Sequence, residues 1–226
     1  MTEDYAASVR GEPIPKARVS AFLNAGGTVP FRGAGNCATS HDDAAHARQH
    51  IAALSARAER QRRRWATQVI ITDELARRAC VARRLAPPGD VLPMQLLTVP
   101  ETDVADLGSI VAAALAHSPA ARALLADLER EQHIPETAVR DYYERNRDRF
   151  LTPDALRRGV DPYDEPAPAD IQPYEDVRNG ITQQLRGAAA RRAFFDWLDR
   201  ARADVVYAEG HEHPGDPSHP DHEHRH

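Results

Sequence analysis

Apolar residues recur at three- and four-residue steps over long stretches of the chain, which is the spacing of a buried helical stripe. The longest such stretch runs from Asp42 to about Leu85. Thr72 is followed by two acidic residues that favour a new helix start, so a kink or break is expected there. Further helices are predicted over 103–116, from the Ser118-Pro119 step, from Pro135 and over 174–203. The fold class is therefore mainly α.

Two short runs near the ends of the chain have the pattern of strands. They cover about 6–10 and about 204–207, and each is too short to be stable alone. Pairing them would satisfy the backbone hydrogen bonds of both, so a small two-stranded pairing of the N- and C-terminal strands is predicted. Between the first strand and its helix, Gly11 and Pro13 indicate a turn. The first helix has Val19, Phe22 and Leu23 as its apolar positions.

The last helix and the segments on either side of it differ sharply in composition. Its core stripe is predicted at Tyr174, Val177, Ile181, Leu185, Ala188, Phe195 and Leu198. The preceding residues 151–173 contain five prolines and are predicted to be a linker. No apolar residue follows Ala208, so 209–226 is predicted to be a disordered tail.

Composition narrows the classes of partner. With 226 residues and 42% hydrophobic content, the chain can build a core without disulfides or a structural metal. Net charge of -5 and an aromatic content of 6% argue against nucleic acid and anionic membranes as partners. The opening MTEDYAASVR lacks the apolar core of a secretory signal, and Cys37 and Cys80 are too few for a disulfide framework. A cytoplasmic protein is expected.

Histidines are concentrated at the end of the chain. Neutral imidazole binds zinc, nickel and copper, and His-x-His spacing lets neighbouring rings reach one ion. A flexible tail of this kind suits buffering or delivery of Ni, Zn or Cu, and no cofactor is required for folding; the alternative is a solvated tail without a metal. The tail candidates are His211, His213, His219, His222, His224 and His226.

A second candidate metal site precedes the long helix in NCATSHDDAAHARQH. Asp42, His46 and His50 share one helix face at steps of four, and Cys37 and His41 lie just upstream. The alternative is a polar helix face with solvated histidines. It is the favoured interpretation, because a Cys-x3-His spacing matches no strong zinc signature.

Other motifs do not indicate catalysis. Arg62, Arg63 and Arg64 are consecutive and point around a helix, so they are expected on a solvated face or interface and not as a nucleic-acid stripe. The loop GTVPFRGAGN lacks the Gly-Lys-Ser/Thr ending of a phosphate-binding loop, and no Gly-x-Ser-x-Gly elbow is present.

The order of these segments resembles the SurA- and PrsA-type foldases. ASVRGEPIPKARVSAFL looks like that family's opening strand, turn and first helix, with Arg10 in place of the usual Asn. RWATQVIITDELARRACVARRL is similar to its paired helices, and VRDYYERNRDRF resembles the Tyr-Tyr-x-x-Asn-x-x-x-Phe segment before its isomerase domain. YEDVRNGITQQLRGAAARRAFFDWLDRARADVVY looks like the long closing helix and terminal strand.

The resemblance implies a helical chaperone module built from both chain ends. Residues 1–150 would form its N-terminal part, and 174–208 its closing helix and strand. In the family a parvulin prolyl-isomerase domain is inserted between them, but here only the 23 residues 151–173 fill that place. They contain no histidine or cysteine and no strand pattern, so isomerase activity is predicted to be absent. Candidate client-binding residues are Tyr142, Tyr143, Phe150 and Trp65. The simplest interpretation of the first three is core or edge packing, but in the family this region adjoins the client-binding cradle.

The leading hypothesis is a non-catalytic chaperone or assembly factor that binds a protein or peptide client. Its histidine tail would hold metal near a metalloenzyme client. An alternative is a metal sequestration or delivery protein whose helical body is a scaffold or a homodimer module. A third hypothesis is an adaptor that binds one folded partner through a helical groove.

Overall fold

The structure is a computed structural model of the 226-residue chain. It describes residues 4–25, 44–86 and 101–213, without the side chains of 44–54 and 101–107. Contacts divide the chain into two units. The first unit comprises Met1–Leu124 and Trp197–His226, and the second comprises Leu125–Asp196. The first unit is thus built from both ends of the chain.

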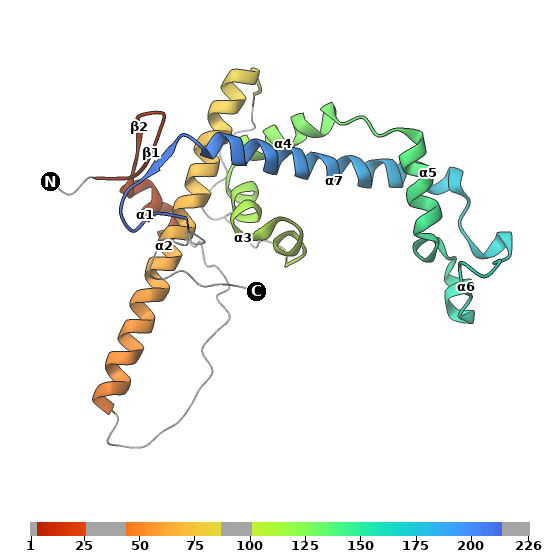
Figure 1. Ribbon diagram of the computed structural model, residues 1–226, viewed down its shortest axis with the longest axis horizontal. Coiled ribbons are helices and arrows are strands. Elements are labelled where there is room, and N and C mark those ends of the chain that lie inside the picture. Colours follow the sequence, from red (N-terminus) through yellow and green to blue (C-terminus); the bar gives the residue numbers. More distant parts are fainter. Residues whose placement is uncertain (1–3, 26–43, 87–100, 214–226) are drawn as a thin grey trace. The chain divides into compact units, whose positions relative to one another are not determined.

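A three-stranded antiparallel sheet joins the two chain ends within the first unit (Figure 1). Its central strand β1 (Tyr5–Val9) pairs with β2 (Glu12–Pro15) on one side and with β3 (Val205–Tyr207) on the other. In the second pairing Ala7 lies opposite Tyr207, and Ser8 lies opposite Val206. The predicted pairing of terminal strands is confirmed, and β2 adds a strand that was not predicted.

The hairpin between β1 and β2 turns in fewer residues than expected. Val9 pairs directly with Glu12, so the turn is confined to Arg10 and Gly11. Both have positive φ, 53° and 82°, which is the backbone form that matches the twist of a tight hairpin. The prolines of β2, at residues 13 and 15, lack an N–H, which an edge strand tolerates. Pro13, which was predicted to lie in the turn, therefore lies in the edge strand β2.

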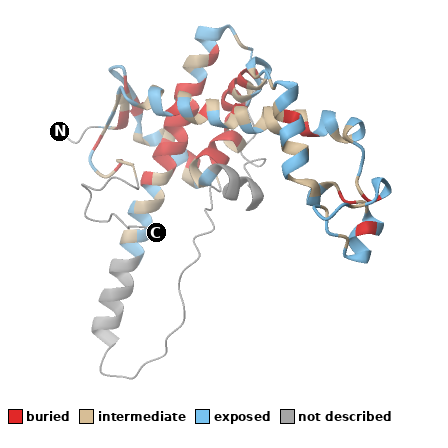
Figure 2. Cartoon of the chain, turned by 45° about the vertical axis from the view of Figure 1, so that its right-hand side comes forward, coloured by how far each residue is buried: buried red, intermediate tan, exposed pale blue. Residues whose placement is uncertain are grey.

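Helices complete the first unit (Figure 1). They are α1 (Lys16–Asn24), α2 (Ala44–Arg83), α3 (Glu101–His117), the start of α4 (Pro119–Glu131) and the end of α7 (Tyr174–Arg202). The middle of the long α2 lies at the core of the unit (Figure 2). Buried apolar side chains come from β1, α1, central α2, the second half of α3, the start of α4 and the end of α7; they include Ala7, Val9, Val19, Phe22, Val69, Ile70, Ile71, Ala114, Leu124 and Leu198.

The helices are interrupted at a different position from the one predicted. α2 runs through Thr72 without interruption, and the predicted kink there is wrong. The Thr72 hydroxyl donates to the carbonyl of Gln68 one turn earlier, at 2.8 Å, and so does not cap a new helix. The predicted helix at 103–116 instead contains a break at Gly108, whose φ of 72° and ψ of 154° are not helical. Glycine reaches this conformation without the strain of a Cβ.

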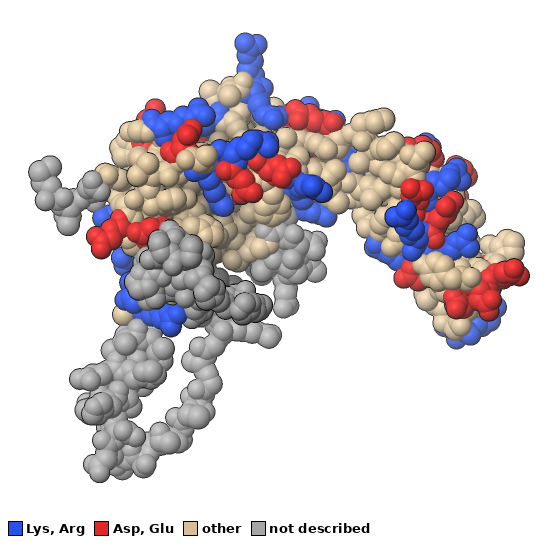
Figure 3. All heavy atoms as spheres, viewed as in Figure 1, with Lys and Arg blue, Asp and Glu red and all other residues tan. Residues whose placement is uncertain are grey.

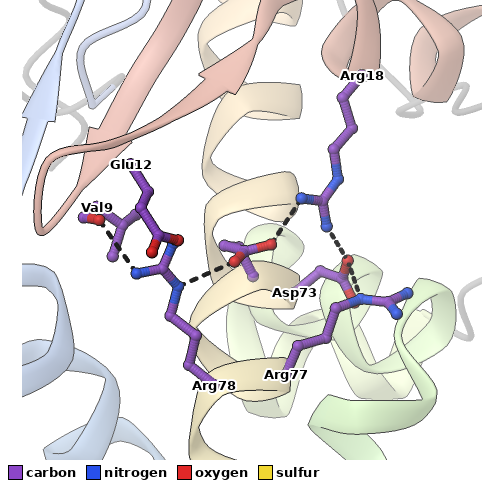
Figure 4. Close-up of polar contacts among 7 residues, drawn as sticks. Val9, Glu12, Arg18, Asp73, Arg77 and Arg78 are labelled. Carbon is purple, nitrogen blue, oxygen red and sulfur yellow. Dashed lines mark hydrogen bonds and ion pairs between the residues drawn. The ribbon is translucent and has the colours of Figure 1, made fainter.

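An ion pair between Arg18 of α1 and a buried carboxylate of α2 attaches the two helices to each other. The carboxylate of Asp73, whose side chain is 2% exposed, accepts hydrogen bonds from Arg18 at 2.6 Å and Arg77 at 3.0 Å (Figure 4). Burial alone would raise the pKa of Asp73, but Ser118, Arg77 and Arg18 outweigh it and hold that pKa below its usual value. Asp73 therefore stays ionised in the core, where its charge is compensated from two helices.

A second set of pairs attaches the hairpin to the same turn of α2. Arg78 donates to Glu74 at 2.9 Å, to Glu12 of β2 at 2.8 Å and to the carbonyl of Val9 at 3.1 Å (Figure 4). Arg18 also reaches Glu74, at 2.7 Å. One guanidinium thus joins the helix to both strands of the hairpin, which fixes the hairpin's orientation on α2.

The second unit is a helical lobe with short 3₁₀ turns. It contains the remainder of α4, α5 (Glu136–Arg145), η3 (Arg147–Phe150), α6 (Pro153–Arg158), η4 (Pro168–Asp170) and α7 as far as Asp196. The closing helix was predicted well in extent, and Ile181 and Leu198 are buried as expected. Its aromatic core position is Phe194, which is 1% exposed, and not the predicted Phe195.

Residues 151–173, predicted to be a linker, are folded. An antiparallel bridge joins Leu151 to Ile171, and the Thr152 N–H donates to the Asp170 carbonyl at 2.8 Å. Thr152 also caps α6 by accepting from the Ala155 N–H at 3.3 Å. Asp170 is 6% exposed and pairs with Arg158. Two of the prolines start α6 and η4, where a missing N–H costs nothing, so the proline content was a poor guide.

Within the described ranges, no single helix is both long and apolar enough to cross a membrane. One pair, Gly108–His117 with Pro119–Glu131, meets that test by length and composition only when both helices are counted together across their bend.

We predict that the closed segment 151–173 resists trypsin, although it contains Arg157 and Arg158. Replacing Asp170 by Asn removes the charge that holds Arg158 and should speed cleavage at these two arginines about fivefold per 1 kcal/mol of lost local stability. The matched control is Asp164→Asn, because Asp164 is an exposed carboxylate in the same segment. The measurement is the cleavage rate by mass spectrometry. Equally rapid cleavage in all three proteins would mean that the segment is open.

Candidate functional site

The start of the histidine tail is anchored in the first unit by a buried arginine. Arg64 of α2 is 0% exposed, and its guanidinium donates to the carbonyl of Glu212 at 3.0 Å and to the carbonyl of His213. Gly210, with φ of 79°, turns the chain onto this helix. Residues 209–213 thus belong to the folded body, and the prediction of disorder from residue 209 is wrong for them.

His211 is the most buried residue of the anchored segment 209–213. It is 4% exposed, and its Nδ1 lies 2.8 Å from the hydroxyl of Thr67, which is itself fully buried. That hydroxyl gives its single hydrogen to the Arg63 carbonyl at 2.9 Å, so the bonding pattern assigns the ring proton to Nδ1. Burial, followed by the charges of Lys16 and Arg63, lowers the pKa of His211, and Glu212 offsets this only in part. The ring is neutral near pH 7.

A cleft of about 320 Å³ opens beside His211, between α1 and α2. Its walls carry more basic than acidic side chains, with polar and apolar groups between them. Arg62 also donates to the Leu23 carbonyl at 3.4 Å, which ties α2 to the last turn of α1. The lining residues are Lys16, Val19, Ser20, Leu23, Asn24, Glu59, Arg62, Arg63 and His211.

The structure places only part of the predicted metal-ligating set. His211 is engaged with Thr67, and His213 lies next to it in the anchor. The side chains of Cys37, His41, Asp42, His46, His50, His219, His222, His224 and His226 lie outside the described residues. Among the described side chains, no group of three His, Cys, Asp or Glu residues is placed to hold a metal ion.

The predicted client-binding aromatic residues fall in different units. Trp65 lies in the first unit, with its ring 5.8 Å from that of Phe22 and its indole N–H donating to Ser109 at 3.3 Å. Tyr142, Tyr143 and Phe150 lie in the second unit.

These three rings pack mainly on their own unit. The ring centroids of Tyr143 and Phe150 are 5.1 Å apart, and the Tyr143 hydroxyl donates to the Gln172 carbonyl at 2.7 Å. Burial raises the pKa of Tyr143. The Tyr142 hydroxyl accepts from Gln184 at 2.8 Å. Tyr143 thus holds residue 172, near the end of the closed segment, against α5.

Sequence reasoning missed the anchor because it treated the three consecutive arginines alike. Arg62 and Arg63 do line the cleft, but Arg64 points into the core. A signal was present: Arg64 lies three and four residues before Thr67 and Gln68, so it shares their face of α2. A tail without apolar residues gave no sign that its backbone carbonyls would serve as partners.

The comparisons with known proteins found no match: no family model fits the chain, and no curated protein or solved structure is similar to it.

We predict that the anchor weakens as the pH falls below about 6.5, the ordinary pKa of histidine. The lowered pKa of His211 means that the unfolded chain binds more protons in this range, so stability is lost as pH falls. His211→Asn keeps a donor for Thr67 but cannot titrate, and it should lose less free energy of unfolding between pH 7.5 and about 5.5 than the natural chain does.

The matched control is His133→Asn, because His133 is an exposed histidine of the second unit. Urea unfolding at each pH gives the free energies. An identical pH dependence in the natural chain and the His211 variant would show that the imidazole is not buried in neutral form.

Proposed function

We propose that this protein is a non-catalytic chaperone or assembly factor that binds a protein or peptide client through a helical module of the SurA type, in the cytoplasm. The observation that carries the proposal is the sheet in which β1 pairs with β3. It closes one helical unit from both ends of the chain, which is the architecture that the resemblance implies.

The segment between Phe150 and Tyr174 supports a function without isomerase chemistry. Its 23 residues form two short helices and a bridge that brings Leu151 beside Ile171. A segment that returns to its starting point can be replaced by a larger insertion without disturbing the rest of the lobe. This geometry supports the proposal of a foldase-like scaffold in which a small closed loop would take the place of an inserted domain.

The histidine tail is proposed as an accessory that holds Ni, Zn or Cu near a metalloenzyme client. His211 is committed to Thr67, so the ligands would come from His213 and the four histidines after it. Metal sequestration or delivery by the tail alone, on a helical scaffold or homodimer, is the competing function. The two differ in whether the folded body has an activity of its own.

The body and the tail can be separated at a position that the structure defines. A deletion starting at residue 211 would remove the partners of Arg64 and Thr67 and damage the body. Deleting residues 214–226 keeps the anchor. We predict that the full chain and the truncated chain suppress the aggregation of chemically unfolded citrate synthase equally, as measured by light scattering.

A length-matched control replaces His219, His222, His224 and His226 by Ser in the full chain. Calorimetric titration with Ni²⁺, Zn²⁺ and Cu²⁺ should show metal binding by the natural chain and its loss in both tail variants. If neither chain suppresses aggregation and metal binding is the only activity, the chaperone function is wrong and sequestration replaces it.

A further inference from the structure

The cleft between α1 and α2 gathers basic side chains that have no acidic ion-pair partner in the part of the chain that the structure describes. Lys16, Arg62 and Arg63 line it, and only one carboxylate, Glu59, lies on its walls. Among the described residues, none of these three cations forms an ion pair with a carboxylate. Arg62 donates a hydrogen bond to the backbone carbonyl of Leu23, a partner that carries no net charge.

Neighbouring basic residues of the same unit, in contrast, do have acidic partners. Arg18, Arg77 and Arg78 are each paired with Asp73 or Glu74 at 3.0 Å or less. Over much of the face drawn in Figure 3, described basic side chains likewise lie next to acidic ones. The described walls of the cleft therefore carry an excess of positive charge. Three basic side chains and one carboxylate line it, so an anion bound there would face two more positive charges than negative ones.

The remaining walls favour a small anionic group carried on a polypeptide. Val19 and Leu23 offer apolar surface for the carbons next to a carboxylate, and Ser20 and Asn24 can hydrogen bond with a peptide backbone. A cleft of about 320 Å³ is at the small end of ligand sites and suits one or two amino-acid residues. Glu59 on the rim disfavours a doubly charged phosphate more than a singly charged carboxylate.

We propose that this cleft binds a carboxylate of the polypeptide client, supplied by an aspartate or glutamate side chain next to apolar residues. Lys16, Arg62 and Arg63 would hold the carboxylate, and Val19 and Leu23 would contact the flanking side chain. The proposal rests on the proposed client-binding function and gives it a specificity: acidic, partly apolar segments are preferred over neutral ones of the same shape.

The test uses a matched pair of fluorescein-labelled peptide amides, Gly-Ser-Leu-Asp-Leu-Ser-Gly and the same peptide with Asn in place of Asp. Fluorescence polarisation measures their affinity for the full chain. We expect the Asp peptide to bind about fivefold more tightly, a preference worth about 1 kcal/mol that shrinks at high salt. Arg62→Gln and Arg63→Gln should each remove most of this preference. Arg200→Gln, an equal loss of charge at an exposed position of α7 in the same unit, should leave it unchanged.

Four results would overturn the proposal. The first is equal binding of the two peptides, and the second is a preference that persists in both cleft variants. The third is binding that occurs only after residues 214–226 are deleted, because the cleft would then belong to the acidic tail of the chain itself. If 10 mM phosphate displaces the peptide as well as 10 mM acetate does, in assays of matched ionic strength, the carboxylate preference is also wrong. Circular dichroism checks that each variant is folded.

The two assays distinguish failure of the cleft proposal from failure of the proposed chaperone function. If citrate synthase aggregation is suppressed but the Asp and Asn peptides bind equally, the chaperone function stands and the cleft has no part in it. If aggregation is not suppressed and neither peptide binds, the proposed function is wrong as well.

Discussion

The structure depends on the pairing of β1 with β3, because β1 is the strand that β3 pairs with, and without β3 one edge of β1 would lose its strand partner. β3 has only three residues, and strands of that length do not persist alone. Two polar contacts hold this end of the chain on α2: the Tyr207 hydroxyl donates to Gln68 at 3.1 Å, and Arg202 reaches Thr72 at 3.3 Å. Strand pairing and helix packing therefore stabilise each other, and α2 carries the contacts for both chain ends.

The second constraint is that α2 buries polar groups along with apolar ones. Arg64, Thr67, Gln68, Thr72 and Asp73 are all at most 1% exposed. Leaving such groups without partners would cost about 1 to 3 kcal/mol each, and more for the charged ones. Their partners from outside α2 come from α1, from the end of α7, from β3 and from the anchor at residues 211–213. The Nε2 of Gln68 has no partner among the described residues. We attribute the specificity of the fold, more than its stability, to these groups.

The sequence predicted those elements whose signals are local and periodic. The closing helix, the helix starts at Ser118 and Pro135, and the two terminal strands all follow from apolar spacing and capping residues. It failed where a long-range partner decides the outcome. In the sequence Thr72 has the pattern of a helix cap, but in the structure its hydroxyl donates to the Gln68 carbonyl. Arg64 has the pattern of a solvated residue, but in the structure it donates to backbone carbonyls at the start of the tail. The cleft could not be predicted at all, since it exists only when Lys16 and Arg62 are brought together.

The most direct measurement of the central claim is a cross-link between the chain ends. Ser8 and Val206 lie directly opposite each other, at the separation that a disulfide can bridge. In a chain with Cys37→Ser, the pair Ser8→Cys and Val206→Cys should form a disulfide on mild oxidation, and the bond should raise the melting temperature because it closes a very long loop. The off-register pair Ser8→Cys and Asp204→Cys should form it poorly. Equal yields from the two pairs, or none from either, would contradict the joining of the two ends.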